Sequence, residues 1–347
     1  MGNEQSGSQA MRSKLLRWLI FMVGLILLTI VAFLVALSTG ELQIALQDIP
    51  GILRSGEGVE FTVLQKVRLP RIILGFAVGG GLSLAGAILQ GIYRNPLVEP
   101  YTLGISGGAA LGVALAIVFA LPMTIGPAIL PVAGFSGALL TIFLVYFLGL
   151  RQGHIHVNNM LLIGVMISFV ASAAMMLLMS LTTAENLHSI IFWMMGSLDE
   201  PNMSLIYLTL IVSVLIFVIS LLFSAPLNAL RLGEDSARYL GINTGLSIRI
   251  LFVLASLLAG TCVAVAGVIG FVGLVIPHLI RLIIGSDYRI LLPGSFIGGG
   301  LFLIICDTIA RTIISPNELP IGVITGIFGG IAFILILSRS QSSLKLS

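Results

Sequence analysis

The chain has 347 residues, of which 58% are hydrophobic and 9% charged, and its mean hydropathy is +1.14. This composition excludes an ordinary soluble domain, so we expect lipid to be the main solvent of the folded chain. The net charge of +3 does not call for a nucleic-acid partner, because membrane orientation accounts for most of the basic residues.

Long apolar runs without alternation predict an all-α, polytopic membrane protein, since a helical span needs about 20 apolar residues and a barrel strand about 10 alternating ones. The first run follows Arg12, Lys14 and Arg17 as in a signal peptide, but it is too long for a cleavable core, so we expect a retained helix. Residues 250–284 could form one and a half helices instead of two. About ten spans are expected, at residues 19–40, 72–93, 102–121, 128–150, 157–182, 203–224, 247–266, 268–284, 292–310 and 319–338.

The basic residues predict the orientation of these spans in the cytoplasmic (inner) membrane. With the N-terminus in the cytoplasm, all but five of the 17 Lys and Arg residues lie inside, and an even number of spans returns the C-terminus to the same side. We therefore expect one transmembrane domain over residues 1–347, with a cytoplasmic tail at 1–17 and a cytoplasmic loop at 225–245. The five outer residues are Arg54, Lys66, Arg68, Arg71 and Arg311.

Two segments share a weak pattern of glycine and proline. Gly86 precedes Pro96 by ten residues, and Gly267 precedes Pro277 by the same interval. A second proline and a glycine cluster follow in each copy. Five spans separate the copies, and an odd offset inverts their orientation, so the pattern indicates an inverted repeat of the kind found in transporters.

The most polar internal segment lies between the sixth and seventh spans. Glu234 and Asp235 would begin a short helix that includes Arg238, and Leu240 and Gly241 would end it, with Gly241 as the C-terminal cap. Such a cytoplasmic helix is a suitable binding site for a second protein. The alternative is that the segment is a solvated loop.

Few residues are candidates for chemistry. Asp307 lies inside a span and could contact substrate, but Arg311 four residues later equally predicts an ion pair. His278 is read as a loop or interface residue, and Cys262 and Cys306 as packing residues. No phosphate-binding loop, metal-ligand cluster or catalytic triad is present, so we expect no enzyme activity, no metal and no cofactor in this chain.

Several motifs in order resemble the FecCD family, the permeases of ABC importers for iron-siderophores, haem and cobalamin. They are RLPR at 68–71, LSLAGAILQGIYRNPLVEPYTLGISGGAALG at 82–112, GEDSARYLGI at 233–242, GVIGFVGLVIPHLIRLIIGSDYR at 267–289 and ELPIGVITG at 318–326. The tail departs mildly from the family pattern at 329–333.

The resemblance implies a ten-helix subunit that forms a homodimer, or a heterodimer with a sister permease. Two cytoplasmic ATP-binding subunits and an extracytoplasmic binding protein would complete the assembly. The resemblance implies that the segment from Glu234 to Gly241 docks on the ATPase. It also places the loop that contains Asn95, Pro96 and Leu97 near the cytoplasmic gate, where Pro96 independently predicts irregular backbone. The matching residues Arg68, Arg71 and Arg311 would form salt bridges with the binding protein; lipid-headgroup anchoring is their alternative role.

The expected function is therefore import of a metal chelate, with an iron-siderophore as the first expectation and cobalamin or haem as alternatives. An ion-coupled secondary transporter is the rival from another class, but it should bury several acids or histidines at mid-bilayer. A membrane scaffold is the second rival, and it would need no Gly/Pro interruptions.

Overall fold

The computed structural model describes residues 2–151, 154–155, 157–314 and 317–344, and it confirms the all-α prediction. Met1, which begins the predicted tail, and residues 345–347 lie outside the described residues. Within the described residues, strand structure is limited to the antiparallel pair β1 (Leu150–Arg151) and β2 (His154–Ile155). The long helices are α1 (Gly2–Ser38), α4 (Leu69–Tyr93), α5 (Ile105–Val118), α7 (Ile129–Gly149), α8 (Val157–Leu181), α10 (Met203–Leu221), α13 (Thr244–Ala266), α14 (Val272–Ile284), α15 (Tyr288–Thr312) and α16 (Ile321–Leu344).

These ten helices of the described chain match the ten predicted spans in order. Seven of them are long and apolar enough to cross a membrane, whereas the apolar parts of α5, α14 and α16 are shorter. At about 1.5 Å per residue, the 13 residues of α14 reach only about 20 Å, less than a hydrocarbon core of about 30 Å. The region 250–284 is thus one full helix followed by a short one.

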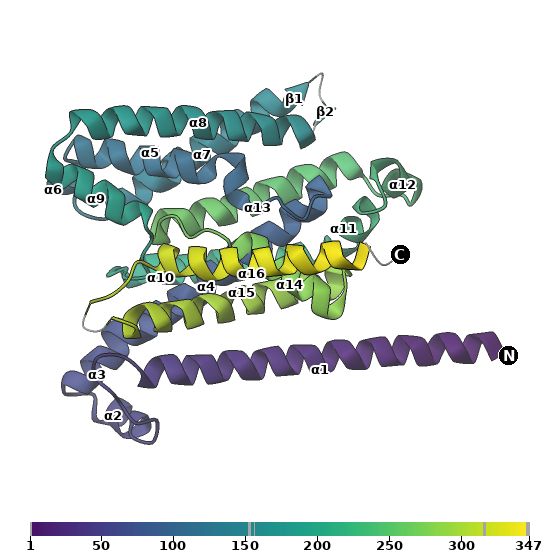
Figure 1. Ribbon diagram of the computed structural model, residues 1–347, viewed down its shortest axis with the longest axis horizontal. Helices are drawn as coiled ribbons and strands as arrows, with labels where there is room; N and C mark the ends of the chain where they lie inside the picture. Colours follow the sequence, from purple (N-terminus) through teal and green to yellow (C-terminus); the bar gives the residue numbers. More distant parts are fainter. Residues whose placement is uncertain (1, 152–153, 156, 315–316, 345–347) are drawn as a thin grey trace.

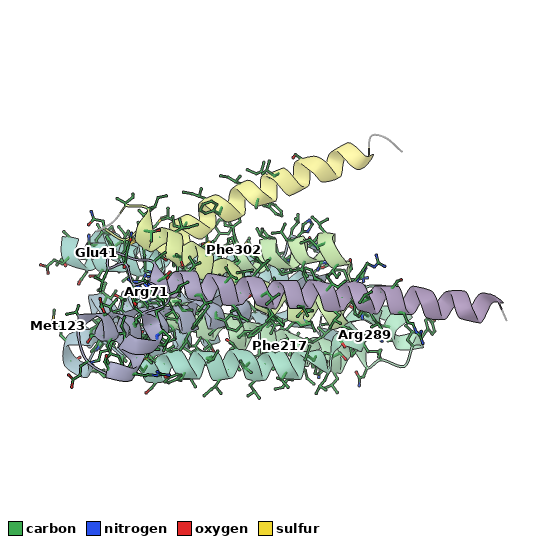
Figure 2. All side chains as sticks on the ribbon, turned by 90° about the horizontal axis from the view of Figure 1, so that it is seen from below. Glu41, Arg71, Met123, Phe217, Arg289 and Phe302 are labelled. Atoms are coloured by element: carbon green, nitrogen blue, oxygen red, sulfur yellow. The ribbon has the colours of Figure 1, made fainter. Side chains whose placement is uncertain are left out.

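The helices lie nearly parallel, and short elements cover the two ends of the bundle (Figure 1). We call one the α12 end, because it holds α11 (Ser224–Leu230), α12 (Glu234–Tyr239) and the N-terminus of α1. The other is the α2 end, and Figure 2 places Arg71 there and Arg289 at the α12 end. It holds α2 (Ile49–Ser55), α3 (Val59–Val63), the π-helical turn η1 (Leu64–Arg68), α6 (Leu121–Ile125) and α9 (Ala184–Met194).

Helix α4 forms the centre of the bundle, where it packs against α10, α13, α14 and α15 and is buried over most of its length. Glycines permit these close approaches. A Cβ on Gly79 would overlap the Gly299 carbonyl of α15, and a Cβ on Gly86 would overlap the Gly273 carbonyl of α14. Small residues suit a bilayer protein, in which helices associate mainly by van der Waals packing.

The architecture repeats between the two halves, but the predicted glycine and proline pairs do not coincide. Taken in order, α4, α5, α7 and α8 of the first half correspond to α13, α14, α15 and α16 of the second. The contact of α4 with α15 then corresponds to that of α13 with α7. The contacts of α5 with α7 and α8 correspond to those of α14 with α15 and α16. In contrast, Gly86 lies inside helix α4 while Gly267 ends α13 at a φ of 70°. Pro96 lies in an exposed loop, whereas Pro277 is buried inside α14. The sequence pattern is therefore not the repeat that the fold contains.

Candidate functional site

The predicted helix between the sixth and seventh spans exists as α12. Glu234 and Asp235 occupy its first turn, and Arg238 lies 3.9 Å from Glu234 one turn later. Gly241 follows in the left-handed region, at a φ of 82°, and its N–H donates to the Arg238 carbonyl. Only a residue without a Cβ adopts this conformation readily, so the sequence ends the helix where it was predicted to end.

Helix α12 presents apolar side chains to its surroundings. Tyr239 is 92% exposed and Leu240 is 64% exposed, although α12 lies at an end of the bundle and not along the sides formed by the long apolar helices. Ala237 is buried beneath them and holds the short helix to the protein. The arrangement leaves a small exposed apolar surface beside a charged first turn.

The predicted gate loop lies at the same end and has irregular backbone, as Pro96 predicted. It begins at Arg94, which ends α4 in the left-handed region. The Oδ1 of Asn95 accepts a 2.9 Å hydrogen bond from the N–H of Leu97, and Asn95, Pro96 and Leu97 are all exposed. The guanidinium of Arg94 approaches Gly233, so the loop adjoins the start of α12.

Beyond this loop the chain re-enters the bundle through the 3₁₀ turn η2 (Pro100–Leu103) and meets the break between α13 and α14. The Ile269 N–H donates to the Tyr101 hydroxyl at 3.3 Å, and Gln90 Nε2 donates to the Gly273 carbonyl at 3.3 Å. Irregular backbone at this depth is tolerated where protein surrounds it. The two interruptions of the helical bundle therefore contact each other.

A polar junction that was not predicted joins α1, α11 and α15 at the α12 end. Asp287 accepts hydrogen bonds from Lys14 at 3.1 Å and from the amide of Asn228 at 2.9 Å. Burial alone would raise the pKa of Asp287, but these donors and the N–H of Arg289 hold it below the usual value. An Asp shortly before an apolar run is a helix N-cap signal, which could have indicated the contact of Asp287 with the Arg289 N–H.

At the α2 end, Arg68, Arg71 and Arg311 are buried in the single chain, and their role in docking a binding protein stays a prediction. All three are at least 93% buried, and their donors are used within the chain. Arg68 donates to the Leu37 and Leu42 carbonyls, at and beyond the end of α1. In the isolated chain these arginines are therefore engaged by groups of the protein itself: Arg71 and Arg311 pair with Asp307, whereas the contacts of Arg68 are with carbonyls.

Asp307 is the centre of this buried cluster. Its two oxygens accept from Arg71 Nη2 at 3.0 Å and from Arg311 Nε at 2.9 Å, so the predicted pair with Arg311 is confirmed. Arg71 also reaches Glu318 at 2.7 Å, and Arg311 reaches the Ala36 carbonyl at 3.4 Å. The cluster ties α1, α4 and α15 to the segment before α16.

Among the described residues, the remaining candidates do not cluster into a catalytic or metal-binding site. His278 is partly exposed on α14, Cys262 and Cys306 are buried as free thiols, and no group of three metal-ligating side chains occurs among the described residues.

Comparison with known proteins places this geometry in context. The model of the FecCD transport family matches residues 27–339. The hemin transport system permease HmuU of Yersinia pestis is 41% identical over 280 residues, which are 79% of this chain and 83% of that protein. The vitamin B12 import permease BtuC of Klebsiella pneumoniae is 39% identical over 326 residues, 94% of each chain. A solved structure described as an inward-facing metal-chelate type ABC transporter aligns with a TM-score of 0.81 and 31% identity, over 93% of this chain and 99% of that one.

Proposed function

This chain belongs to the FecCD transport family, and from that premise we propose that it is the membrane-spanning permease of an ATP-driven importer, with its α12 end in the cytoplasm. Two ATP-binding subunits would hydrolyse ATP, and a second permease copy would complete the translocation path. The chain itself would move cargo without changing it chemically, and no cofactor or metal would reside in it.

The exposed surface of α12 carries this proposal. Tyr239 and Leu240 expose apolar area at an end of the bundle and not along the sides formed by the long apolar helices. Exposed apolar area rimmed by charged residues marks sites where partners bind. We assign that partner as the ATP-binding subunit, which would contact Leu240 and Gly241 and the charged first turn formed by Glu234 and Asp235, with Arg238 beside it.

Movement of α12 would reach the rest of the permease through contacts in this chain. Helix α11 leads directly into α12 and holds the start of α15 through Asn228. Arg94 joins the Asn95 to Leu97 loop to the start of α12. We propose that this loop is the cytoplasmic gate and that closure of the ATPase pair shifts it.

The cargo would be a metal chelate. The relatives HmuU and BtuC are named for hemin and vitamin B12, and an iron-siderophore remains our first expectation. An extracytoplasmic binding protein would deliver the cargo to the α2 end. Measuring which chelate that binding protein retains, among an iron-siderophore, hemin and cobalamin, would identify the cargo.

The alternative of an ion-coupled transporter has little support. Among the described side chains, Asp307 is the one buried carboxylate, and two arginines already pair with it. A coupling ion would have to displace one of them.

Co-purification tests the proposed partner. The full chain should retain its ATPase subunit, and Leu240→Asp should abolish both retention and uptake while insertion remains normal. The control Leu53→Asp changes a similarly exposed leucine at the α2 end and should retain the ATPase. Normal retention by Leu240→Asp would show that α12 is not the docking element.

A further inference from the structure

A basic pocket that the proposed function does not use lies at the α12 end. It has a volume of about 220 Å³ and is formed where α4, α11, α14 and α15 meet. A water occupies about 30 Å³ in the liquid, so this space is large enough for a group of several heavy atoms. Its walls are Gln90, Arg94, Pro96, Arg231, Arg281, Ser286 and Tyr288.

Three arginines line this pocket, and no carboxylate does. Arg231 donates to the Ser286 carbonyl at 2.6 Å, and Arg281 lines the pocket together with Tyr288. Neither neighbour neutralises a positive charge, and within the described residues Arg94, Arg231 and Arg281 have no ion-pair partner of this chain. Three like charges around one cavity repel each other, so an anion in it would be strongly attracted.

The amide of Gln90 provides a second, independent requirement. This side chain is 97% buried, and its Nε2 donates to the Gly273 and Leu274 carbonyls at 3.3 and 3.4 Å. Its Oε1 is buried without a hydrogen-bond donor. A buried acceptor left without a partner is costly, so a ligand of this pocket should also bring a donor.

We propose that the pocket binds a phosphate group that carries a hydroxyl donor. The phosphate oxygens would accept from the arginines, whose planar guanidinium groups match phosphate bidentately, and the hydroxyl would donate to Gln90 Oε1. Hydrogen phosphate and a phosphatidylglycerol headgroup both have this chemistry. A carboxylate from a protein partner satisfies the charges but offers no donor.

The position of the pocket gives such a ligand a structural consequence. One wall is Arg94 with Pro96 of the predicted gate loop, another is Arg231 next to α12, and a third is Arg281 on α14. A bound phosphate would hold these three segments together. Basic pockets between helices on the cytoplasmic side of membrane proteins commonly accept lipid headgroups. The inference that lipid can supply the group rests on the proposed orientation.

Binding measurements on the purified full chain test the proposal. Inorganic phosphate should raise the thermal midpoint in detergent, and sulfate, which has the same shape but carries no proton at neutral pH, should bind less tightly. The variant Arg94→Gln/Arg281→Gln should weaken phosphate about tenfold or more. Gln90→Met should remove the preference for phosphate over sulfate. Native mass spectrometry from nanodiscs should show retention of phosphatidylglycerol over phosphatidylcholine.

The matched control is Arg289→Gln, which removes the same charge at the same end without lining the pocket (Figure 2). It should bind as the wild type does. Retention of phosphatidylglycerol without an effect of free phosphate supports the proposal and identifies a lipid as the source of the phosphate group. An effect of free phosphate without retention of phosphatidylglycerol also supports it and identifies a soluble phosphate as the source. Binding of neither probe, or equal loss in Arg289→Gln, would overturn it. If the wild type binds neither probe and the pocket variants lose the ATPase subunit, the site belongs to a protein carboxylate. Because the binding assay uses neither transport nor the ATPase, its failure would leave the proposed function untouched.

Discussion

Asn228 on α11 and Asp287 at the start of α15 are joined by a 2.9 Å hydrogen bond, 59 residues apart in the chain. The same amide accepts from the Tyr288 N–H at 3.0 Å, so both of its polar atoms are used on one helix terminus. Lys14 adds a 3.1 Å ion pair from α1. Since α11 leads into α12, this junction links the proposed coupling helix to α15, in addition to the direct contact of α12 with α13, in which Arg238 Nε donates to Thr244 Oγ1 at 3.1 Å.

Replacing Asn228 with Ala should uncouple ATP hydrolysis from uptake. Both hydrogen bonds are lost, Asp287 keeps Lys14 and the Arg289 N–H, and the free energy of unfolding should fall by about 1–3 kcal/mol. The measurement is the ratio of cargo transported to ATP hydrolysed in proteoliposomes.

Asn243→Ala is the matched control for that experiment. Asn243 caps α13 by accepting from the Leu246 N–H, so its loss should destabilise by about 1 kcal/mol but leave the α11–α15 contact intact. An unchanged transport ratio in Asn228→Ala, or an equal fall in both variants, would argue against transmission through this junction.

Acid should weaken the same junction. The pKa of Asp287 is lowered below 3.8 in the folded protein: burial acts to raise it, but the donors that surround the carboxylate outweigh that effect. A lowered folded-state pKa adds stability that is present above the unfolded value and is lost as pH falls through the folded one. The difference in thermal midpoint between wild type and Asp287→Asn should therefore be constant near neutral pH and shrink below about pH 3.8. A difference that grows on acidification would reverse the assigned sign.

Much of the fold follows from the sequence because its signals are local. Each long helix coincides with a predicted span, and α12 follows from two acids at its start and Gly241 after its end. These patterns depend on residues within a few turns of each other, which composition and spacing reveal. The same locality explains why a short α14 was predicted only as one of two alternatives. The glycines that flank α14 indicate that a helix breaks there, but they do not show how deep in the membrane the break lies.

The contacts that decide the roles of single charges are not local. Arg71 meets Asp307 from 236 residues away, so the sequence showed an arginine at the outer level but not its buried partner. A basic residue that departs from the orientation bias can equally be neutralised inside the protein, so that bias does not by itself assign these arginines to docking, and their docking role stays a prediction. Asn228 is likewise an isolated polar residue in an apolar stretch until the fold brings α15 beside it.

The buried cluster at the α2 end should respond strongly to loss of its carboxylate. Asp307→Asn would leave Arg71 and Arg311 buried with reduced compensation, so we expect a loss of about 3–5 kcal/mol in the free energy of unfolding. Glu318→Gln is the control, because that side chain is 48% exposed and its pair with Arg71 should contribute about 0–1 kcal/mol. Unfolding by denaturant in detergent micelles measures both. Equal, small effects would show that the cluster is not structural.

The contact between α4 and α14 provides the last prediction. A Cβ at Gly86 would overlap the backbone of Gly273, and a backbone carbonyl cannot rotate away as a side chain can. Gly86→Ala should therefore force α4 and α14 apart, although alanine is the better helix former, and should cost about 1–3 kcal/mol of stability. Because η2 and the Tyr101 to Ile269 contact lie beside this crossing, uptake should fall as well. Gly24→Ala in α1 makes the same change where no atom lies within 4 Å, and it should be neutral or slightly stabilising. The thermal midpoints of the two variants, measured against wild type, decide the matter: if Gly86→Ala is as stable as Gly24→Ala, the helices do not approach as closely at this crossing as the structure places them.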